Sequence, residues 1–256
     1  NIIAGLVVFQ ILSTNNTVAG NYFGIGPDGT TLVENVLVES EFVVRGNLHT
    51  FGGPTDSARN VFAGVVDFQD ADSITFQNNY VGVMPDGETG LPFKYLQLGG
   101  GSNNSLIGGD GDGEGNVIAN IIIRDTGTSG NTFEGNLIGL NASGTDGLGI
   151  NDTAITIRSG ASGNSIGTPA AGNVISTAKS GVPTTTNQVA IRVRDTGTDG
   201  NFIQNNIIGL NPTGDAVVGN DSGIVVSTGA SGTLIGGPGI DEGNVISASL
   251  GGSSRG

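Results

Sequence analysis

The chain has 256 residues, a formal net charge of −14 and no cysteine, and 47 of its residues are glycine. The acidic balance argues against binding to nucleic acids or anionic membranes, and the missing cysteines exclude disulfides, thiol catalysis and cysteine-ligated zinc. No apolar run reaches the roughly 18 residues of a membrane-spanning helix, and no Gly-X-Y period indicates collagen.

The first recurring motif begins at Val18 and reads Val-Ala-Gly-Asn-Tyr-Phe-Gly-Ile, with Asn21 as its anchor. Equivalent asparagines follow at intervals of 58, 57 and 70 residues; they are Asn79, Asn136 and Asn206. A second motif, Asn-Val followed by Phe or Ile, recurs at intervals of 56, 57 and 71 residues; its anchors are Asn60, Asn116, Asn173 and Asn244. The fixed order of the motifs predicts four repeats of about 57 residues, with one insertion near residues 177–189.

Each repeat contains short apolar runs bounded by Gly, Asn, Asp or Ser. In the third repeat these runs cover residues 120–124, 131–134, 136–140, 154–158, 164–166 and 173–176. The runs are rich in β-branched residues, which indicates strands joined by tight turns, and none shows the 3.6-residue period of a helix. Six strands grouped in threes predict two turns of about 28 residues in each repeat.

Turns made of three short strands and three corners predict an all-β fold, a single-stranded parallel β-helix or β-solenoid. Four repeats of two turns give about eight or nine coils, which would stack at about 4.8 Å, the usual spacing between strands. Apolar side chains should point inward, and Gly and Asn should occupy corners that need left-handed backbone. We expect one such domain over residues 1–256.

Three segments, residues 115–120, 135–140 and 229–237, resemble the right-handed parallel β-helix repeats of large bacterial secreted and surface proteins. The resemblance extends over essentially the whole chain and implies a right-handed helix. It also implies an extracellular or cell-surface location, with a secretion signal that is not in this chain. It does not select a function, because such repeats serve as stalks, adhesins and enzyme scaffolds alike.

The anchoring asparagines are expected at corners, where their side chains turn inward and bond the backbone and a neighbouring amide. This interpretation predicts two structural ladders instead of a ligand-binding stripe. One contains Asn21, Asn79, Asn136 and Asn206, and the other contains Asn1, Asn60, Asn116, Asn173 and Asn244.

A candidate calcium site is the segment 108–116, where Asp110, Asp112 and Glu114 alternate with glycines as the early ligands of a calcium loop do. The position at which an EF-hand loop carries its bidentate Glu is Ile121, and the equivalent corners at 54–57 and 169–172 lack the carboxylates. The favoured interpretation is a solvated acidic turn. We expect no other metal and no cofactor.

Carboxylates could also support glycoside hydrolysis or polysaccharide lysis. The candidates are Asp67, Asp70, Asp72, Glu39 and Glu41. No basic cluster accompanies them, and the single histidine, His49, is expected to be an ordinary surface residue in a turn. The sequence Arg-Asp-Thr-Gly-Thr occurs at 124–128 and again at 194–198, where an ion pair beside a turn is favoured over a carbohydrate contact.

Repetition without a reactive cluster predicts a non-enzymatic structural module of an extracellular surface, stalk or filament protein. Two alternatives stay open: a carbohydrate-binding or carbohydrate-active β-helix, and a phage or cell-surface recognition fibre. The expected partners are other copies of the chain, end to end, and a cell-surface polysaccharide; nucleic acid and membrane insertion are not expected.

The ends of the chain carry the last expectation. Residues 1–8 align with the interior segment 116–123, so the chain opens in mid-repeat, and no atypical terminal repeat or helix is visible. Uncapped ends of a β-helix present unpaired strand edges. The sequence therefore predicts a fragment or processed piece whose ends are covered, by head-to-tail packing of identical subunits or by more of the same polypeptide.

Overall fold

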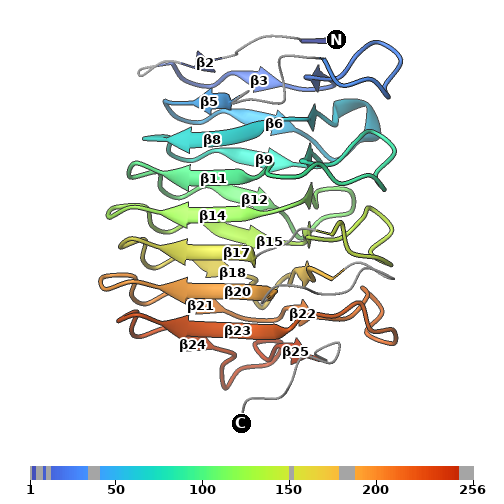
Figure 1. Ribbon diagram of the computed structural model, residues 1–256. Helices are drawn as coiled ribbons and strands as arrows, with labels where there is room; N and C mark the ends of the chain where they lie inside the picture. Colours follow the sequence, from blue (N-terminus) through green and yellow to red (C-terminus); the bar gives the residue numbers. More distant parts are fainter. Residues whose placement is uncertain are drawn as a thin grey trace.

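The computed structural model describes residues 2–3, 8–9, 13–33, 41–149, 153–178 and 188–247. In these residues the chain forms three all-parallel sheets, which are stacked along one axis (Figure 1). One short 3₁₀ turn, η2 (Asp56–Ala58), interrupts a corner. The described residues contain no helix that is long and apolar enough to cross a membrane.

The three sheets consist mainly of strands of two to six residues. Sheet A contains β1 (Ile2–Ile3), β4 (Tyr22–Phe23), β7 (Val61–Phe62), β10 (Tyr80–Val81), β13 (Val117–Ile118), β16 (Leu137–Ile138), β19 (Val174–Ile175), β22 (Ile207–Ile208) and β25 (Val245–Ile246). Sheet B contains β2 (Val8–Phe9), β5 (Glu41–Val44), β8 (Val65–Gln69), β11 (Leu96–Gly99), β14 (Ile121–Arg124), β17 (Thr153–Arg158), β20 (Val189–Arg194) and β23 (Ser222–Ser227). Sheet C contains β3 (Thr17–Val18), β6 (Thr50–Gly52), β9 (Thr75–Gln77), β12 (Leu106–Gly108), β15 (Thr132–Glu134), β18 (Ser165–Ile166), β21 (Phe202–Ile203) and β24 (Leu234–Ile235).

The chain visits the sheets in the constant order A, B, C, so that every third strand pairs with its predecessor. Eight complete coils result, followed by β25 as a ninth strand of sheet A. In Figure 1 the strands of sheet B cross the front to the left and those of sheet C return behind them, while the chain descends from the N-terminus. The fold is therefore a right-handed parallel β-helix with two coils per repeat, as the sequence predicts.

The two coils of a repeat differ in length, which corrects the expectation of equal turns. Sheet A strands begin at residues 22, 61, 80, 117 and 137, so that long and short coils alternate. The long coils carry a hairpin-like loop between sheets A and B, each closed by one antiparallel bridge. The bridges join Ile25 to Leu32, Val83 to Gly90, Leu140 to Gly147 and Leu210 to Val217. All four loops leave the helix at the same corner, at the right of Figure 1.

A short polar side chain folds each hairpin-like loop. Asp86 Oδ1 accepts the backbone N–H groups of Glu88 and Thr89 at 2.8 and 2.9 Å, and Asp28 does the same in the first loop. In the third and fourth loops the amide oxygens of Asn141 and Asn211 take this role. Hydrogen bonds from the side chain and backbone of Thr31 hold the pKa of Asp28 well below its usual range.

The third repeat is longer because one connection is longer. Between β19 and β20 the chain spends residues 176–188, whereas two residues join β7 to β8 and two join β13 to β14. This connection coincides with the insertion that the sequence predicts near 177–189. Residues 179–187 lie outside the described part of the chain.

The core is a set of apolar columns that continue from coil to coil. Along sheet B, Ile121 pairs with Ile155 and Ile155 with Ile191, and all three side chains are fully buried. Phenylalanines fill much of the core of the N-terminal half; the rings of Phe23 and Phe62 stack with centroids 4.6 Å apart. Because each fully buried Ile or Phe contributes about 1.5–3 kcal/mol, these columns supply much of the stability of the fold.

Glycine is required where the strands of sheet C end. Gly108 and Gly167 have φ angles of 95° and 77°, in the left-handed region that side chains rarely adopt. A Cβ atom at either position would lie 1.9 Å from a backbone oxygen of the next coil, that of Glu134 or Gln204. The recurring Ile-Gly sequence is thus imposed by close backbone contact between coils.

Candidate functional site

The eight described anchoring asparagines form one ladder. The backbone N–H and the Nδ2 of Asn136 both donate to Asn173 Oδ1, at 3.1 and 2.9 Å, and the same pair of bonds joins each member to the next. In order along the axis the members are Asn21, Asn60, Asn79, Asn116, Asn136, Asn173, Asn206 and Asn244. The two series seen in the sequence alternate in this ladder because each repeat contains two coils. Asn1 lies outside the described residues.

Each ladder asparagine also bonds the backbone. Asn136 Nδ2 donates to the carbonyl oxygens of Ile107 and Glu134, at 2.8 and 2.9 Å, and its side chain is buried. Both polar atoms of the amide are therefore occupied inside the protein. A stripe of this kind holds coils together and offers no group to a ligand.

A second ladder, at the entry to sheet C, was not recognised from the sequence. Ser105 N–H donates to Asn131 Oδ1, Asn131 Nδ2 donates to Asn164 Oδ1, and Asn164 N–H donates to Asn201 Oδ1, at 3.0, 2.9 and 3.0 Å. All four residues are buried. The signal was present, because each of these asparagines follows a glycine and precedes an inward-facing apolar residue by two positions.

His49 occupies the same corner and is not a surface residue, which corrects the sequence expectation. Its exposed fraction is 0 %. The backbone N–H of Asn16 donates to His49 Nδ1 at 3.1 Å, which places the hydrogen on Nε2, 3.3 Å from Ser13 Oγ. Burial lowers the pKa of His49, so the ring is held neutral inside the rod.

The acidic segment 108–116 forms an exposed turn. Glu114 Oε2 accepts the backbone N–H of Gly111 at 2.9 Å, and Asp110 and Asp112 are exposed. The fourth repeat has the same turn, in which Glu242 accepts from Gly239 at 2.7 Å. Within the described residues, no three His, Cys, Asp or Glu side chains form a group that could hold a metal ion. Glu114 thus has a structural role, and calcium binding stays an untested prediction.

Two of the carboxylates considered for catalysis, Asp67 and Asp72, are engaged in structural contacts. Asp67 is buried and accepts hydrogen bonds from Gln69 Nε2 and from Gln97 Nε2, the latter at 2.9 Å. Asp72 Oδ1 accepts the backbone N–H of Asn103 at 2.8 Å, and Asp70 adopts a left-handed corner conformation with φ 53°. Glu39 lies outside the described residues, and Glu41 begins β5.

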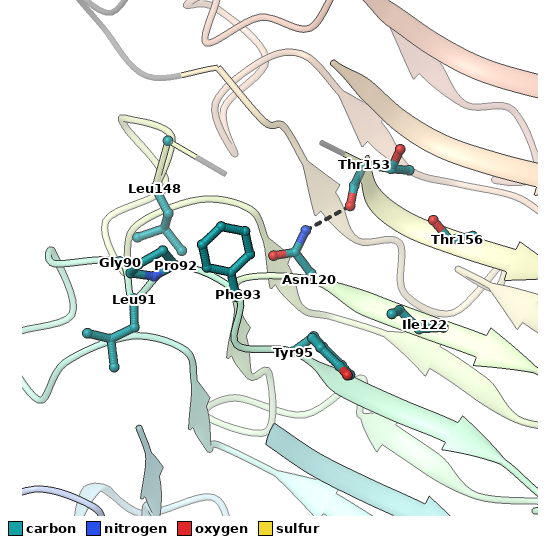
Figure 2. A pocket seen from close by; sticks show the side chains of 11 residues that line it. Gly90, Leu91, Pro92, Phe93, Tyr95, Asn120, Ile122, Leu148, Thr153 and Thr156 are labelled. Atoms are coloured by element: carbon teal, nitrogen blue, oxygen red, sulfur yellow. Dashed lines mark hydrogen bonds between the residues drawn. The ribbon is translucent and has the colours of Figure 1, made fainter. Parts of the chain in front are cut away.

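A cavity of about 500 Å³ opens on the outer face of sheet B, beside the second and third hairpin-like loops (Figure 2). The loops contribute Leu91, Phe93 and Leu148, and the sheet contributes Asn120, Ile122 and Thr156. Asn120 Nδ2 donates to the backbone oxygen of Thr153 at 2.8 Å, so this amide is fixed at the wall. None of the described lining residues is Asp, Glu, His, Lys or Arg, and most of them are apolar, as in cavities that bind ligands.

Phe93 is the unusual residue of this cavity. Its side chain is 90 % exposed, and its backbone has φ 60°, a left-handed conformation that is costly for a bulky residue. Neither the exposed ring nor the left-handed backbone of Phe93 stabilises the apolar core. Strained backbone and exposed aromatic rings are both more frequent at binding sites than elsewhere.

Arginines line the same outer face of sheet B. Five of the nine basic residues of the chain lie there, and each is half-buried along the sheet; they are Arg45, Arg124, Arg158, Arg192 and Arg194. Arg124 pairs with Asp125 at 3.0 Å. Among the described residues, no carboxylate lies within ion-pairing distance of Arg158, Arg192 or Arg194. The ion pair expected between Arg194 and Asp195 is therefore absent; Asp195 Oδ2 accepts the backbone N–H of Ser159 instead.

Comparisons with known proteins give no match, so inferences about function rest on the fold and its geometry. No family model matches the chain, and no curated protein and no solved structure matches it either. The parallel β-helix is established by the three stacked sheets themselves.

Proposed function

We propose that the chain is a non-enzymatic structural module, a stiff β-solenoid segment of an extracellular surface, stalk or filament protein. The observation that carries this proposal is the ladder of eight asparagines, which continues through the described coils without a break. A reactive site usually interrupts such regularity at one place. Here the buried amides of the ladder are used in joining one coil to the next.

Contact between rods end to end is part of the proposal. Interior members of the apolar columns such as Ile203 and Ile208 are fully buried, whereas their partners in the last described strands, Ile235 and Ile246, are 46 % and 50 % exposed. A further coil stacked there would bury these side chains and pair the free edges of β24 and β25. A second copy of the chain can supply that coil in a head-to-tail arrangement, which builds an open filament.

The test is electron microscopy and sizing of the purified chain, with Ile235→Asp as a variant of the apolar end and Phe202→Asp as a control one coil further in. We expect filaments or end-to-end multimers from the parent and single rods from Ile235→Asp. Single rods of monomer mass from the parent at high concentration would contradict end-to-end contact. A stable compact trimer would favour the recognition-fibre alternative.

A panel of acidic and neutral polysaccharides tests the non-enzymatic part of the proposal. After prolonged incubation with the protein, with or without calcium, we expect no change in the length of the polysaccharides. Release of shortened or unsaturated fragments would show a carbohydrate-active enzyme and would refute a purely structural role.

A further inference from the structure

We propose that the outer face of sheet B binds an acidic polysaccharide. In this site Arg158, Arg192 and Arg194 bind the carboxylate or sulfate groups of the chain, and a sugar ring packs on Phe93. The inference goes beyond the structural role proposed above, because it assigns a ligand class to one face of the rod.

The first observation in favour of this site is the uneven distribution of basic residues over the protein. The protein carries a net charge of −14, yet its arginines are concentrated on one sheet face. Arg124 and Arg158 are direct partners on adjacent strands, and Arg192 and Arg194 follow on the next strand. Like charges opposite each other on neighbouring strands destabilise a sheet. Only Asp125 and Asp195 are close in sequence to these arginines, and Asp195 is engaged with Ser159.

The guanidinium groups are available for a ligand. Arg158 and Arg192 form no ion pair and no side-chain hydrogen bond within the described residues, and Arg194 Nε is buried without a hydrogen-bond partner there. Guanidinium groups bind carboxylate and sulfate in bidentate fashion, which suits them to acidic sugars.

The arginines and the cavity form one continuous path. Thr156 lines the cavity and is the register partner of Arg192, while Ile122, also in the lining, is the partner of Thr156. Side chains in this row project from the same face of successive strands. In Figure 2 Phe93 and Asn120 stand at the wall of the cavity, with Ile122 and Thr156 along the sheet beside it. A ligand lying along the helix axis would contact the aromatic ring first and then the arginines.

The spacing and the aromatic content favour a polysaccharide over a nucleic acid. Cationic groups recur from coil to coil at about 4.8 Å, which is close to the length of one sugar residue in an extended polysaccharide. Nucleic-acid grooves present a series of aromatic side chains on which successive bases stack, whereas this cavity has only Phe93 and Tyr95 among its described lining residues.

Binding is measured by titration calorimetry of the whole chain at low salt with four probes: polygalacturonate, dextran sulfate, neutral dextran and single-stranded poly(dT). We expect one or both acidic polysaccharides to bind and neutral dextran not to bind. The two acidic probes distinguish carboxylate from sulfate recognition. Arg192→Gln should weaken binding about ten-fold or more, the usual loss for one charge-assisted hydrogen bond.

Arg59→Gln is the matched control, because it removes the same charge from a corner where Arg59 pairs with Asp56 and covers Tyr80. Its affinity should equal that of the parent, and thermal melts show whether each variant is folded. Three results would overturn the proposal: no binding of either acidic polysaccharide, equal weakening by Arg59→Gln and Arg192→Gln, or tighter binding of poly(dT) than of the polysaccharides.

Discussion

At the scale of single residues, buried amides determine how the coils are joined. A ladder asparagine contributes its backbone N–H, its Oδ1 and both hydrogens of Nδ2 to neighbouring coils, as Asn136 shows. Asn is the shortest side chain that carries an amide, with its donor and its acceptor on separate atoms, so it fits a corner that must satisfy both. His49 at the other ladder shows that an acceptor nitrogen can replace the amide oxygen.

The first prediction concerns Asn136. Replacement by Leu removes a buried donor and acceptor and leaves their partners on Asn116 and Asn173 unsatisfied, so we expect a loss of about 1–3 kcal/mol in the free energy of unfolding. Urea denaturation provides the measurement. Asn47→Leu, at an exposed corner, serves as the control and should cost less than Asn136→Leu. Equal stability of Asn136→Leu and the parent would argue against a structural ladder.

The second prediction concerns pH. Burial lowers the pKa of His49 from the usual 6.5, so the unfolded chain binds a proton more readily than the folded one. The stabilising contribution of neutral His49 is present above the unfolded pKa and is lost as the pH falls below it. Between pH 7 and pH 5 the urea midpoint of the parent should therefore decrease. His49→Asn keeps a ladder amide and removes the only histidine, so its midpoint should change less; an equal decrease would refute this assignment.

The third prediction separates ligand binding from stability at Phe93. Phe93→Gly relieves a left-handed conformation worth roughly 1–2 kcal/mol and increases the entropy of the unfolded chain by a comparable amount. The melting temperature should therefore stay unchanged or rise slightly, while affinity for acidic polysaccharide falls. Leu48→Gly is the control, because Leu48 is also exposed, at 57 %, and has φ 61°. Equal affinity of Phe93→Gly and Leu48→Gly would exclude Phe93 from the site.

At the scale of elements, corner geometry fixes how successive strands meet. Strands of two or three residues have little pairing energy of their own, and interior ones persist because each lies between two parallel neighbours. Glycine allows the backbone of one coil to approach the next, as at Gly108. The long hairpin-like loops can vary in length without disturbing the sheets, since they leave from a single corner.

The fourth prediction tests this close approach. Gly108→Ala places a Cβ 1.9 Å from the oxygen of Glu134, whereas Gly163, with φ 63°, has no atom within 4 Å of such a Cβ. Both variants incur the cost of a left-handed alanine, roughly 1–2 kcal/mol. Only Gly108→Ala must also separate two coils, so its loss in the free energy of unfolding should clearly exceed that of Gly163→Ala. Similar losses in the two variants would show that the corner can relax.

Much of the fold and less of the candidate site can be predicted from the sequence. The periodic asparagines predict the coil, because a repeating corner needs a repeating residue. Unequal coil lengths were missed because the hairpin-like loops contain apolar residues such as Leu140 and Leu210, which imitate strands. The alternation of Ile191, Arg192, Val193 and Arg194 is visible in the sequence, but its alignment with Thr156 depends on corner lengths that only the structure shows.

At the scale of the whole molecule, stability is additive along one axis. Each strand pairs only with strands of the adjacent coils, so the sheets behave as a linear array in which interior coils have two partners and a terminal coil has one. Outside the sheets, the hairpin-like loops reach two coils away, as where the Ala142 N–H donates to the backbone oxygen of Gly87. The exposed apolar side chains of the last described coil are a direct consequence. Local unfolding should therefore start at a terminal coil, which has one partner, and proceed inward.

Hydrogen exchange measures this gradient and supplies the last prediction. At low protein concentration, amides of β24 and β25 should exchange fastest and those of β14 and β17 slowest, because opening an interior strand requires loss of contacts on both sides. If a second copy stacks on the last coil, a rise in concentration should protect β24 and β25 and leave β14 unchanged, since association stabilises only the coil that it covers. Ile235→Asp should abolish the concentration dependence. Uniform exchange along the rod would contradict the linear array, and a gradient that does not respond to concentration would contradict end-to-end contact alone.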